Sequence, residues 1–317
     1  MTLRPLWPFG PLRLVKKAFE RDMQKQAVSI HRCENLICNT NHVYRIETGD
    51  GAYIMKLYRS PGYPEEGKLV FVAERLAEYS IPHARICYCN SRDSDFPNGY
   101  IIEECLPGVT ADRLVLTEVE TCELYRRLAA LASEIHQIKF TGYGFIERGV
   151  PDCSTFTEHI EKNFIYGIHH IHSAYTQAEL EALKRILAER LRPCDDIEAC
   201  LCHNDIQPKN ILVNGNSITL IDWDDARAFP AIVDIARLTL LMELAYDNEQ
   251  PEDKRKAGMY RRAFLDHYKF DDGGKIYREL GPALHVWHGL VLLNFCAEGT
   301  PQFEKIRTVI DEKIGLL

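Results

Sequence analysis

The sequence predicts an α+β fold in which a small β-rich lobe precedes a large helical lobe. Residues 27–106 contain short segments of alternating apolar residues separated by turn residues, which is typical of antiparallel strands. Residues 107–317 contain longer segments with the apolar spacing of helices. A polar hairpin lies inside this second part, so we expect a functional cleft between the two lobes.

The composition narrows the function classes. The 317 residues are 46% hydrophobic, which suits one large domain or two lobes. A formal net charge of −8 argues against nucleic-acid binding, which needs a basic surface. The 11 cysteines are scattered and odd in number, so we expect reduced thiols in the cytoplasm. The longest apolar run, over residues 283–297, is too short for a membrane span.

Residues 1–26 predict a helical extension packed on the small lobe, with a membrane-surface helix as the alternative. In the small lobe we expect strands over residues 27–30, 42–48, 52–58, 83–89 and 100–106, and a helix over residues 65–79. The segment Ala52–Tyr58 places Lys56 on the same strand face as Ile54 and Tyr58. A lysine on an inward face needs an anion. Its alternative is an edge lysine that reaches solvent.

The large lobe is expected to be helical apart from the hairpin. We expect helices over residues 117–138, 155–172, 176–192, 232–245, 254–267, 282–297 and 303–314. Capping boxes begin two of them, at Thr117 and Thr176. Between Gly108 and the hairpin we expect no strand.

The hairpin lies within Leu201–Asp225, which reads LCHNDIQPKNILVNGNSITLIDWDD. Asn-Gly-Asn supplies its turn residues. Asp205 and Asn210 lie in the same loop, and pairing of the two strands brings Asp222 back beside Asn210. Carboxylate and amide oxygens are the ligands that Mg²⁺ prefers, and Asp205 is placed to accept a proton from a hydroxyl. With Lys56 as a phosphate-binding cation, the residues needed for phosphoryl transfer are present.

Two motifs in this stretch resemble those of a known superfamily. His203-Asn204-Asp205 followed by Asn210, and Ile221-Asp222-Trp223-Asp224, resemble the H-x-D-x-x-x-x-N and I-D-[WF]-[ED] motifs of the aminoglycoside phosphotransferase and choline kinase superfamily. The resemblance extends from about Cys33 to Met242. It implies a protein-kinase-like two-lobe fold, ATP as the phosphate donor with GTP as an alternative, and Mg²⁺.

The resemblance also implies roles for particular residues. Asp205 is the expected catalytic base, and Asn210 and Asp222 are the expected metal ligands. The expected nucleotide-binding residues are Lys56, its helix partner Glu66, the phosphate loop Asn39, Thr40 and Asn41, the adenine-binding connector Glu104 and Leu106, and Leu212 under the adenine ring. His203 supports the loop, Asp234 ties a helix N-terminus to it, and Asp224 is either a support or a further metal contact.

Three other groups have a functional and a structural interpretation. His169, His170 and His172 could bind metal, but neighbouring helical residues point in different directions. The aromatic residues Tyr246, Trp287 and Phe295, with His288, form either a wall for a cationic substrate or part of the helical core. The acids Glu243, Asp247 and Glu249 form either an acidic rim or a solvated helix end.

The function predicted from the sequence is therefore an ATP-dependent kinase of a small hydroxylated molecule. The acidic balance favours a cationic acceptor such as an aminoglycoside, amino sugar or amino alcohol. Choline, ethanolamine, homoserine and neutral sugars remain alternative acceptors. A nucleotide-binding scaffold with little catalysis is the alternative from another class. The sequence does not indicate an oligomeric state.

Overall fold

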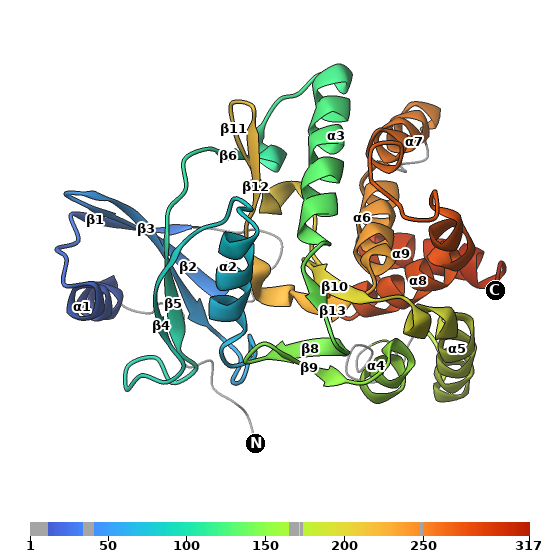
Figure 1. Ribbon diagram of the computed structural model, residues 1–317, viewed down its shortest axis with the longest axis horizontal. Helices are drawn as coiled ribbons and strands as arrows, with labels where there is room; N and C mark the ends of the chain where they lie inside the picture. Colours follow the sequence, from blue (N-terminus) through green and yellow to red (C-terminus); the bar gives the residue numbers. More distant parts are fainter. Residues whose placement is uncertain (1–11, 34–40, 165–170, 172–173, 247–249) are drawn as a thin grey trace.

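The computed structural model describes residues 12–33, 41–164, 171, 174–246 and 250–317. Its N-terminal part is a five-stranded antiparallel sheet in the order β1-β2-β3-β5-β4, with one helix on each side (Figure 1). These elements are α1 (Leu12–Met23), β1 (Ser29–Cys33), β2 (Asn41–Thr48), β3 (Gly51–Tyr58), α2 (Lys68–Glu78), β4 (Ile86–Asn90) and β5 (Tyr100–Glu104).

The two faces of strand β3 serve different purposes. Tyr53, Met55 and Leu57 are buried in a core shared with Val15 and Phe19 of α1, so α1 is a structural part of this lobe. The opposite face carries Lys56, as the alternation of the strand predicts. Helix α2 lies on that side of the sheet, and its apolar residues belong to the core of the larger C-terminal part. The sheet thus presents Lys56 toward the rest of the molecule.

The C-terminal part is mainly helical and surrounds one large core. Its helices are α3 (Glu118–Ile135), α4 (Phe156–Asn163), α5 (Gln177–Arg190), α6 (Ala231–Tyr246), α7 (Pro251–Leu265), α8 (Lys275–Leu293) and α9 (Pro301–Ile314). Both predicted capping boxes are present, at Thr117 and Thr176. Helix α8 begins before the expected position and includes Pro282 in its interior.

The expectation that no strand precedes the hairpin is wrong. The missed strands are β6 (Val109–Thr110), β7 (Lys139–Phe140), β8 (Tyr143–Glu147), β9 (Val150–Cys153) and β10 (Ala199–Cys202). Strand β13 (Arg227–Phe229) joins four of them in a second sheet, ordered β7-β10-β13-β8-β9. Most of these strands are too short to show an alternating pattern, and their pairing depends on distant segments.

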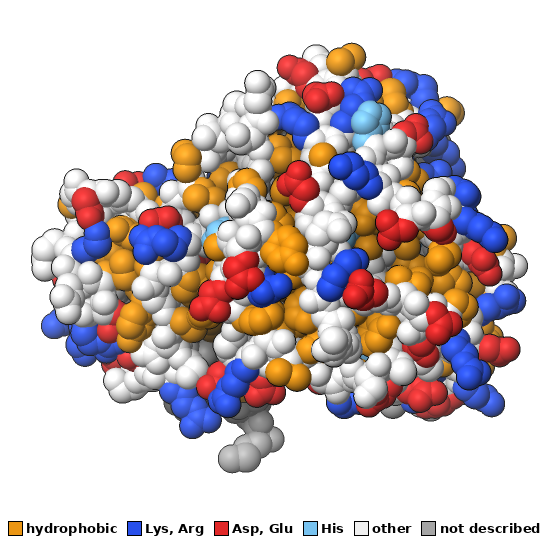
Figure 2. Space-filling model, viewed as in Figure 1, with side chains coloured by type: hydrophobic (Ala, Val, Ile, Leu, Met, Phe, Trp, Pro, Cys, Tyr) orange, Lys and Arg blue, Asp and Glu red, His pale blue; other side chains and the backbone are white. Residues whose placement is uncertain are grey.

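Two surface properties accompany this fold. On the face shown in Figure 2, acidic and basic side chains are interspersed among apolar ones. Among the described helices, none has both the length and the apolar character required to cross a bilayer.

Because the protein buries neutral histidines such as His288, we expect its free energy of unfolding to decrease in acid. Burial lowers the pKa of His288 to about 3, and a ring nitrogen of this residue lies 2.9 Å from the carbonyl oxygen of Val233. Below pH 6.5 the imidazole of His288 binds a proton in the unfolded chain but stays neutral in the folded chain. The free energy of unfolding therefore falls as the pH falls. For His288 this difference removes about 2 kcal/mol of the free energy of unfolding between pH 6.5 and pH 5.

His288→Gln is expected to reduce this loss by about 2 kcal/mol, because the amide donates to Val233 without titrating. The measurement is the free energy of unfolding in urea at pH 7 and pH 5. His267→Gln, at an exposed position, is the matched control. An unchanged pH dependence in His288→Gln would contradict the prediction.

Candidate functional site

The hairpin has the predicted geometry. Strands β11 (Ile211–Asn214) and β12 (Ser217–Leu220) pair antiparallel, with Ile211 opposite Leu220. The backbone nitrogen of Ile221 donates to the carbonyl oxygen of Asn210 at 3.0 Å. Asp222 follows directly and has a left-handed backbone conformation, with φ 68°. The residue expected to bind metal on the return strand is therefore next to the residue that pairs with Asn210.

Both carboxylate oxygens of Asp205 contact other side chains. Its Oδ2 accepts a hydrogen bond from the amide nitrogen of Asn210 at 2.8 Å, and that nitrogen also donates to the backbone oxygen of Asp205 at 2.9 Å. Both hydrogen bonds are donated by the amide nitrogen of Asn210, so neither of them involves its amide oxygen. The other carboxylate oxygen, Oδ1, accepts from Gln207 at 2.6 Å and lies 3.5 Å from Arg237. The loop therefore fixes this carboxylate.

Lys56 is the cation at the junction of the two parts. Its Nζ lies 3.2 Å from Asp222, 3.5 Å from Glu103 and 3.8 Å from Asp224. Burial disfavours its charge, but Glu103, Asp222 and Asp224 outweigh burial and raise the pKa of Lys56 well above its ordinary value. Burial likewise opposes ionisation of Asp222, yet Lys56 holds the pKa of Asp222 below its ordinary value. Lys56 and Asp222 therefore form a charged pair.

The expectation that Glu66 is the helix partner of Lys56 is wrong. Glu66 lies outside α2 and pairs with Arg148 at 2.6 Å. Glu103 of β5 contacts Lys56 instead. In the register of β3 and β5, Lys56 is opposite Ile101, so Glu103 is its diagonal neighbour on the same face. The anion for this lysine therefore comes from the sheet and not from the helix.

Asp224 lies next to this pair. Its Oδ2 accepts from the amide nitrogen of Asn41 at 2.6 Å, which connects the start of β2 to the hairpin segment. Burial beside Asp222 and Glu103 raises the pKa of Asp224 to about 7. Asn41 is thus the described member of the expected phosphate loop, whereas Asn39 and Thr40 lie outside the described residues.

A buried lysine in α2 was not predicted from the sequence. Lys68 is fully buried, and its Nζ donates to the backbone oxygen of Asp224 and pairs with Glu65. It also lies 5.5 Å from the ring of Tyr63, whose hydroxyl donates to Asp225 at 3.0 Å. Helix α2 is thereby attached to the segment after Asp222. A cation in the first turn opposes the helix dipole, so local patterns gave no signal for it.

Asp234 in the first turn of α6 holds the loop from below. Its carboxylate accepts from the backbone nitrogens of His203 and Asn204, each at 2.8 Å. A ring nitrogen of His203 lies 2.9 Å from the carbonyl oxygen of Ile221, so this histidine joins the loop to the return strand. These contacts agree with the supporting roles expected for Asp234 and His203.

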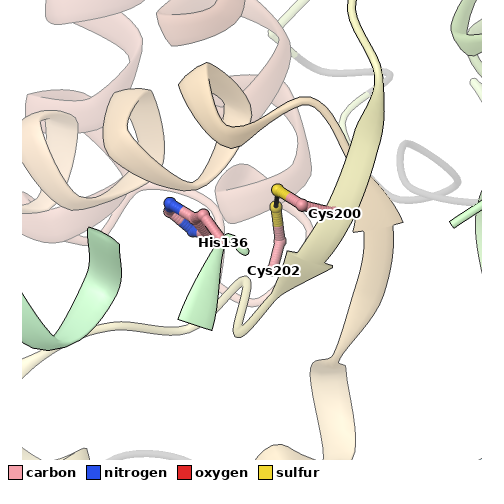
Figure 3. A group of neighbouring side chains, drawn as sticks. All are labelled: His136, Cys200 and Cys202. Atoms are coloured by element: carbon pink, nitrogen blue, oxygen red, sulfur yellow. Dashed lines mark hydrogen bonds between the residues drawn. The ribbon is translucent and has the colours of Figure 1, made fainter. Parts of the chain in front are cut away.

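The side chains of His136, Cys200 and Cys202 form a buried cluster (Figure 3). The ring nitrogens of His136 lie 2.7 Å from the hydroxyl of Tyr268 and 3.3 Å from Asp234. The two sulfur atoms are 4.0 Å apart, and both thiols donate to the carbonyl oxygen of Phe229. Because these groups are already hydrogen-bonded, we interpret the cluster as support for the loop.

The residues expected around adenine lie along one edge of the junction. The backbone nitrogen of Glu104 donates to the carbonyl oxygen of Arg85 at 3.0 Å. Leu106 makes no backbone–backbone bond within the described chain. Strand β6 joins this connector to the hairpin, with Thr110 opposite Leu212. Leu212 is half-buried beside it.

The three groups with two interpretations have different outcomes. Trp287 is buried and packs against Phe156 and Phe229, so it belongs to the core. Glu243 pairs with Lys313 at 2.9 Å. Phe295 is exposed. The side chain of Tyr246 and residues His169, His170, His172, Asp247 and Glu249 lie outside the described part.

The arrangement can therefore place a carboxylate beside hard oxygen ligands and a buried lysine, which is the chemistry of phosphoryl transfer. The functional neighbours that sequence reasoning missed are Glu103, Lys68 and Arg237. Only Arg237 carried a usable signal, because it lies one helical turn after Asp234 and so shares its face.

Comparison with solved structures shows the same fold at low sequence identity. A thermostable mutant of the aminoglycoside phosphotransferase APH(4)-Ia, in a ternary complex with ADP and hygromycin B, has a TM-score of 0.65 and 15% identity over 95% of this chain and 98% of its own. Plasmodium vivax ethanolamine kinase has a TM-score of 0.65 and 14% identity, over 99% and 92% of the two chains. The streptomycin–ATP–APH(2″)-IIa complex has a TM-score of 0.56 and 14% identity, over 99% and 97%.

No curated protein matches this sequence significantly. The family model of the phosphotransferase enzyme family matches residues 39–279. That range includes Lys56, the motif from His203 to Asn210 and the motif around Asp222. The kinase-like fold expected from these motifs is confirmed by the structural matches. The fold of this chain is thus similar to those of an aminoglycoside phosphotransferase and an ethanolamine kinase, and the chain belongs to the phosphotransferase enzyme family.

Proposed function

We propose that this phosphotransferase transfers the γ-phosphate of ATP to a hydroxyl group of a small molecule. The observation that carries the proposal is the convergence of Asp205, Asn210 and Asp222 at one loop and hairpin, with Lys56 only 3.2 Å from Asp222. The ADP and ATP named for similar structures support an adenine nucleotide as the donor. GTP remains the alternative donor.

In the proposed reaction, the acceptor oxygen forms a bond to the γ-phosphorus as the bond from this phosphorus to the β–γ bridging oxygen breaks. The electron pair leaves with ADP, and Asp205 takes the proton of the hydroxyl. Asn210 and Gln207 hold the carboxylate of Asp205 in one orientation for this step. Lys56 offsets the charge of the phosphates.

The donor set fits a magnesium ion. Asp222 is held ionised by Lys56, and the hydrogen bonds of Asn210 leave its amide oxygen free. Both are hard oxygen ligands, and Mg²⁺ commonly binds through one or two such side chains plus phosphates and water. When bound, the ion neutralises phosphate charge. Asp222 and Asn210 are the residues proposed to hold it.

The proposal assigns the remaining contacts to two regions. Residues 27–106, with the helical extension in residues 1–26, supply most of the nucleotide contacts. Residues 107–317 supply Leu212, the loop that contains Asp205, and the acceptor site. The proposed nucleotide contacts are Asn39, Thr40, Asn41, backbone groups of Glu104 and Leu106, and the side chain of Leu212. Glu66 is replaced by Glu103 as the partner of Lys56. The described cysteines are all free thiols, which supports a cytoplasmic location.

The first acceptors to test are cationic alcohols. The net charge of −8 favours them, and aminoglycosides and ethanolamine are named for proteins of similar fold. The test measures ADP release with MgATP and a panel of aminoglycosides, choline, ethanolamine, homoserine and hexosamines. Turnover by any member supports the proposed reaction. Nucleotide binding without turnover by any acceptor would favour the scaffold alternative.

Asp222→Asn is expected to weaken the magnesium-dependent part of ATP binding by tenfold or more, because it removes a charged ligand; even indirect metal contacts contribute about 10-fold. Calorimetric titration of ATP with and without Mg²⁺ measures this effect. Asp225→Asn, in the same segment but bonded to Tyr63, is the matched control. Equal magnesium dependence in Asp222→Asn and the unmodified protein would exclude the ligand role.

A further inference from the structure

Arg237 is a buried cation whose hydrogen-bonding capacity the described protein leaves largely unused. It is 6% exposed, and its contact to Oδ1 of Asp205 is 3.5 Å long, at the outer limit of a hydrogen bond. Its Nε is buried without a hydrogen-bond partner among the described residues. A guanidinium carries five N–H donors, and buried donors are normally satisfied. The guanidinium of Arg237 therefore has donors available for a bound group.

The position of Arg237 separates it from the proposed nucleotide contacts. Asn210 bonds to Oδ2 of Asp205, whereas Arg237 approaches Oδ1. Asn210 and Asp222 belong to the side proposed for metal and phosphates. Arg237 comes from α6 and reaches the other oxygen of the same carboxylate. An acceptor whose hydroxyl reaches Asp205 therefore has its neighbouring substituents close to Arg237.

The acids near this position have other partners. Lys209 Nζ lies 3.8 Å from Oδ2 of Asp205, the oxygen that also accepts from Asn210, so Lys209 belongs to the side proposed for metal and phosphates. The nearby acid Asp225 accepts from Tyr63 and lies 3.5 Å from Arg227. Glu243, further along α6, pairs with Lys313. Asp225 and Glu243 thus each have a partner, although the charge of Arg237 also acts on Asp225 and Oε2 of Glu243 has no hydrogen-bond partner among the described residues. The Nε of Arg237 remains without a hydrogen-bond partner in the described part of the chain.

We propose that Arg237 binds an anionic group of the acceptor, a carboxylate or a phosphate, close to the hydroxyl that is phosphorylated. The planar fork of a guanidinium matches both groups with two parallel hydrogen bonds. This inference rests on the proposed function, and it narrows the acceptor to hydroxy acids or phosphorylated alcohols. An amino acid with a hydroxyl group also satisfies the preference for a cationic group, because it carries both charges.

The experiment compares alcohols that differ only in the anionic group. The full chain with MgATP is assayed on homoserine against 3-aminopropan-1-ol, glycerate against glycerol, and glycerol 3-phosphate against glycerol. We expect a higher kcat/KM for the anionic member of at least one pair, and the pair that responds identifies carboxylate or phosphate. Arg237→Met is expected to raise KM for that acceptor by on the order of 100-fold, with a smaller change in kcat.

Arg237→Lys keeps the charge but loses the fork, so it should recover part of the affinity. Arg255→Met changes an exposed arginine of α7 that pairs with Glu118 and Glu252, and serves as the matched control. An unchanged thermal shift with MgATP shows that each variant is folded. The inference is overturned if no anionic member is preferred in any pair, or if Arg237→Met lowers turnover of neutral and anionic acceptors equally.

A binding measurement separates this inference from the proposed function. The same pairs are titrated calorimetrically in the absence of ATP. Preferential binding of an anionic member that is lost in Arg237→Met, with no phosphorylation of any acceptor, would support the anion site and refute the phosphotransfer reaction. Phosphorylation of neutral or cationic acceptors that Arg237→Met leaves unchanged would support the reaction and refute the anion site.

Discussion

Replacing Asp205 with alanine is expected to lower kcat by on the order of 10²–10⁴-fold while MgATP binding stays within about twofold of normal. The carboxylate accepts the acceptor proton in the proposed reaction, so its loss affects the chemical step. Nucleotide contacts should remain, because Asn210 still donates to the backbone oxygen of residue 205 at 2.9 Å. Single-turnover phosphate transfer and the Kd of MgATP measure the two effects separately.

Asp205→Asn is the informative control for this prediction. Its amide oxygen can still accept the hydrogen bond from Asn210, so this contact is retained while the base is lost, whereas its amide nitrogen cannot accept from Gln207. Equal loss of turnover in both variants would assign the effect to proton transfer. Near-normal turnover in Asp205→Asn, or a parallel loss of MgATP binding in Asp205→Ala, would show that Asp205 has a structural role instead.

The hairpin was predictable because its information is local. Turn residues, the alternation of Ile218 and Leu220, and the spacing from Asn210 to Asp222 together determine which side chains meet. Lys56 was predictable for the same reason, since one buried cation on an otherwise apolar strand indicates a nearby anion. The kinase-like fold followed from the same motifs and is confirmed by the comparisons.

The partners of these residues were less predictable. The assignment of Glu66 relied on family resemblance, whereas the pairing of Lys56 with Glu103 depends on the register of β3 and β5. No pattern within either strand determines that register. The burial of Lys68 depends on how α2 packs against the segment after Asp222. Such contacts arise from tertiary packing, which local propensities do not encode.

Asp234→Ala is expected to lower the free energy of unfolding by about 3–5 kcal/mol and to abolish most turnover. Asp234 is 1% exposed. Its carboxylate accepts hydrogen bonds from the backbone nitrogens of His203 and Asn204 and lies 3.3 Å from a ring nitrogen of His136. Each buried donor left without a partner costs about 1–3 kcal/mol. Asp311→Ala, which removes an exposed carboxylate bonded to Tyr175, is the matched control.

The pH dependence of this prediction follows from the ionisation of Asp234. Burial opposes its charge, but the hydrogen bond and charge of His136 hold the pKa of Asp234 below its ordinary value. A lowered pKa gives stability that is present above the unfolded value, about 3.9, and lost as the pH falls through the folded value. The difference in unfolding free energy between the unmodified protein and Asp234→Ala, measured in urea, should therefore be full at pH 7 and shrink below about pH 4. A difference that stayed constant into acid would mean that the carboxylate holds the loop by shape alone, without its charge.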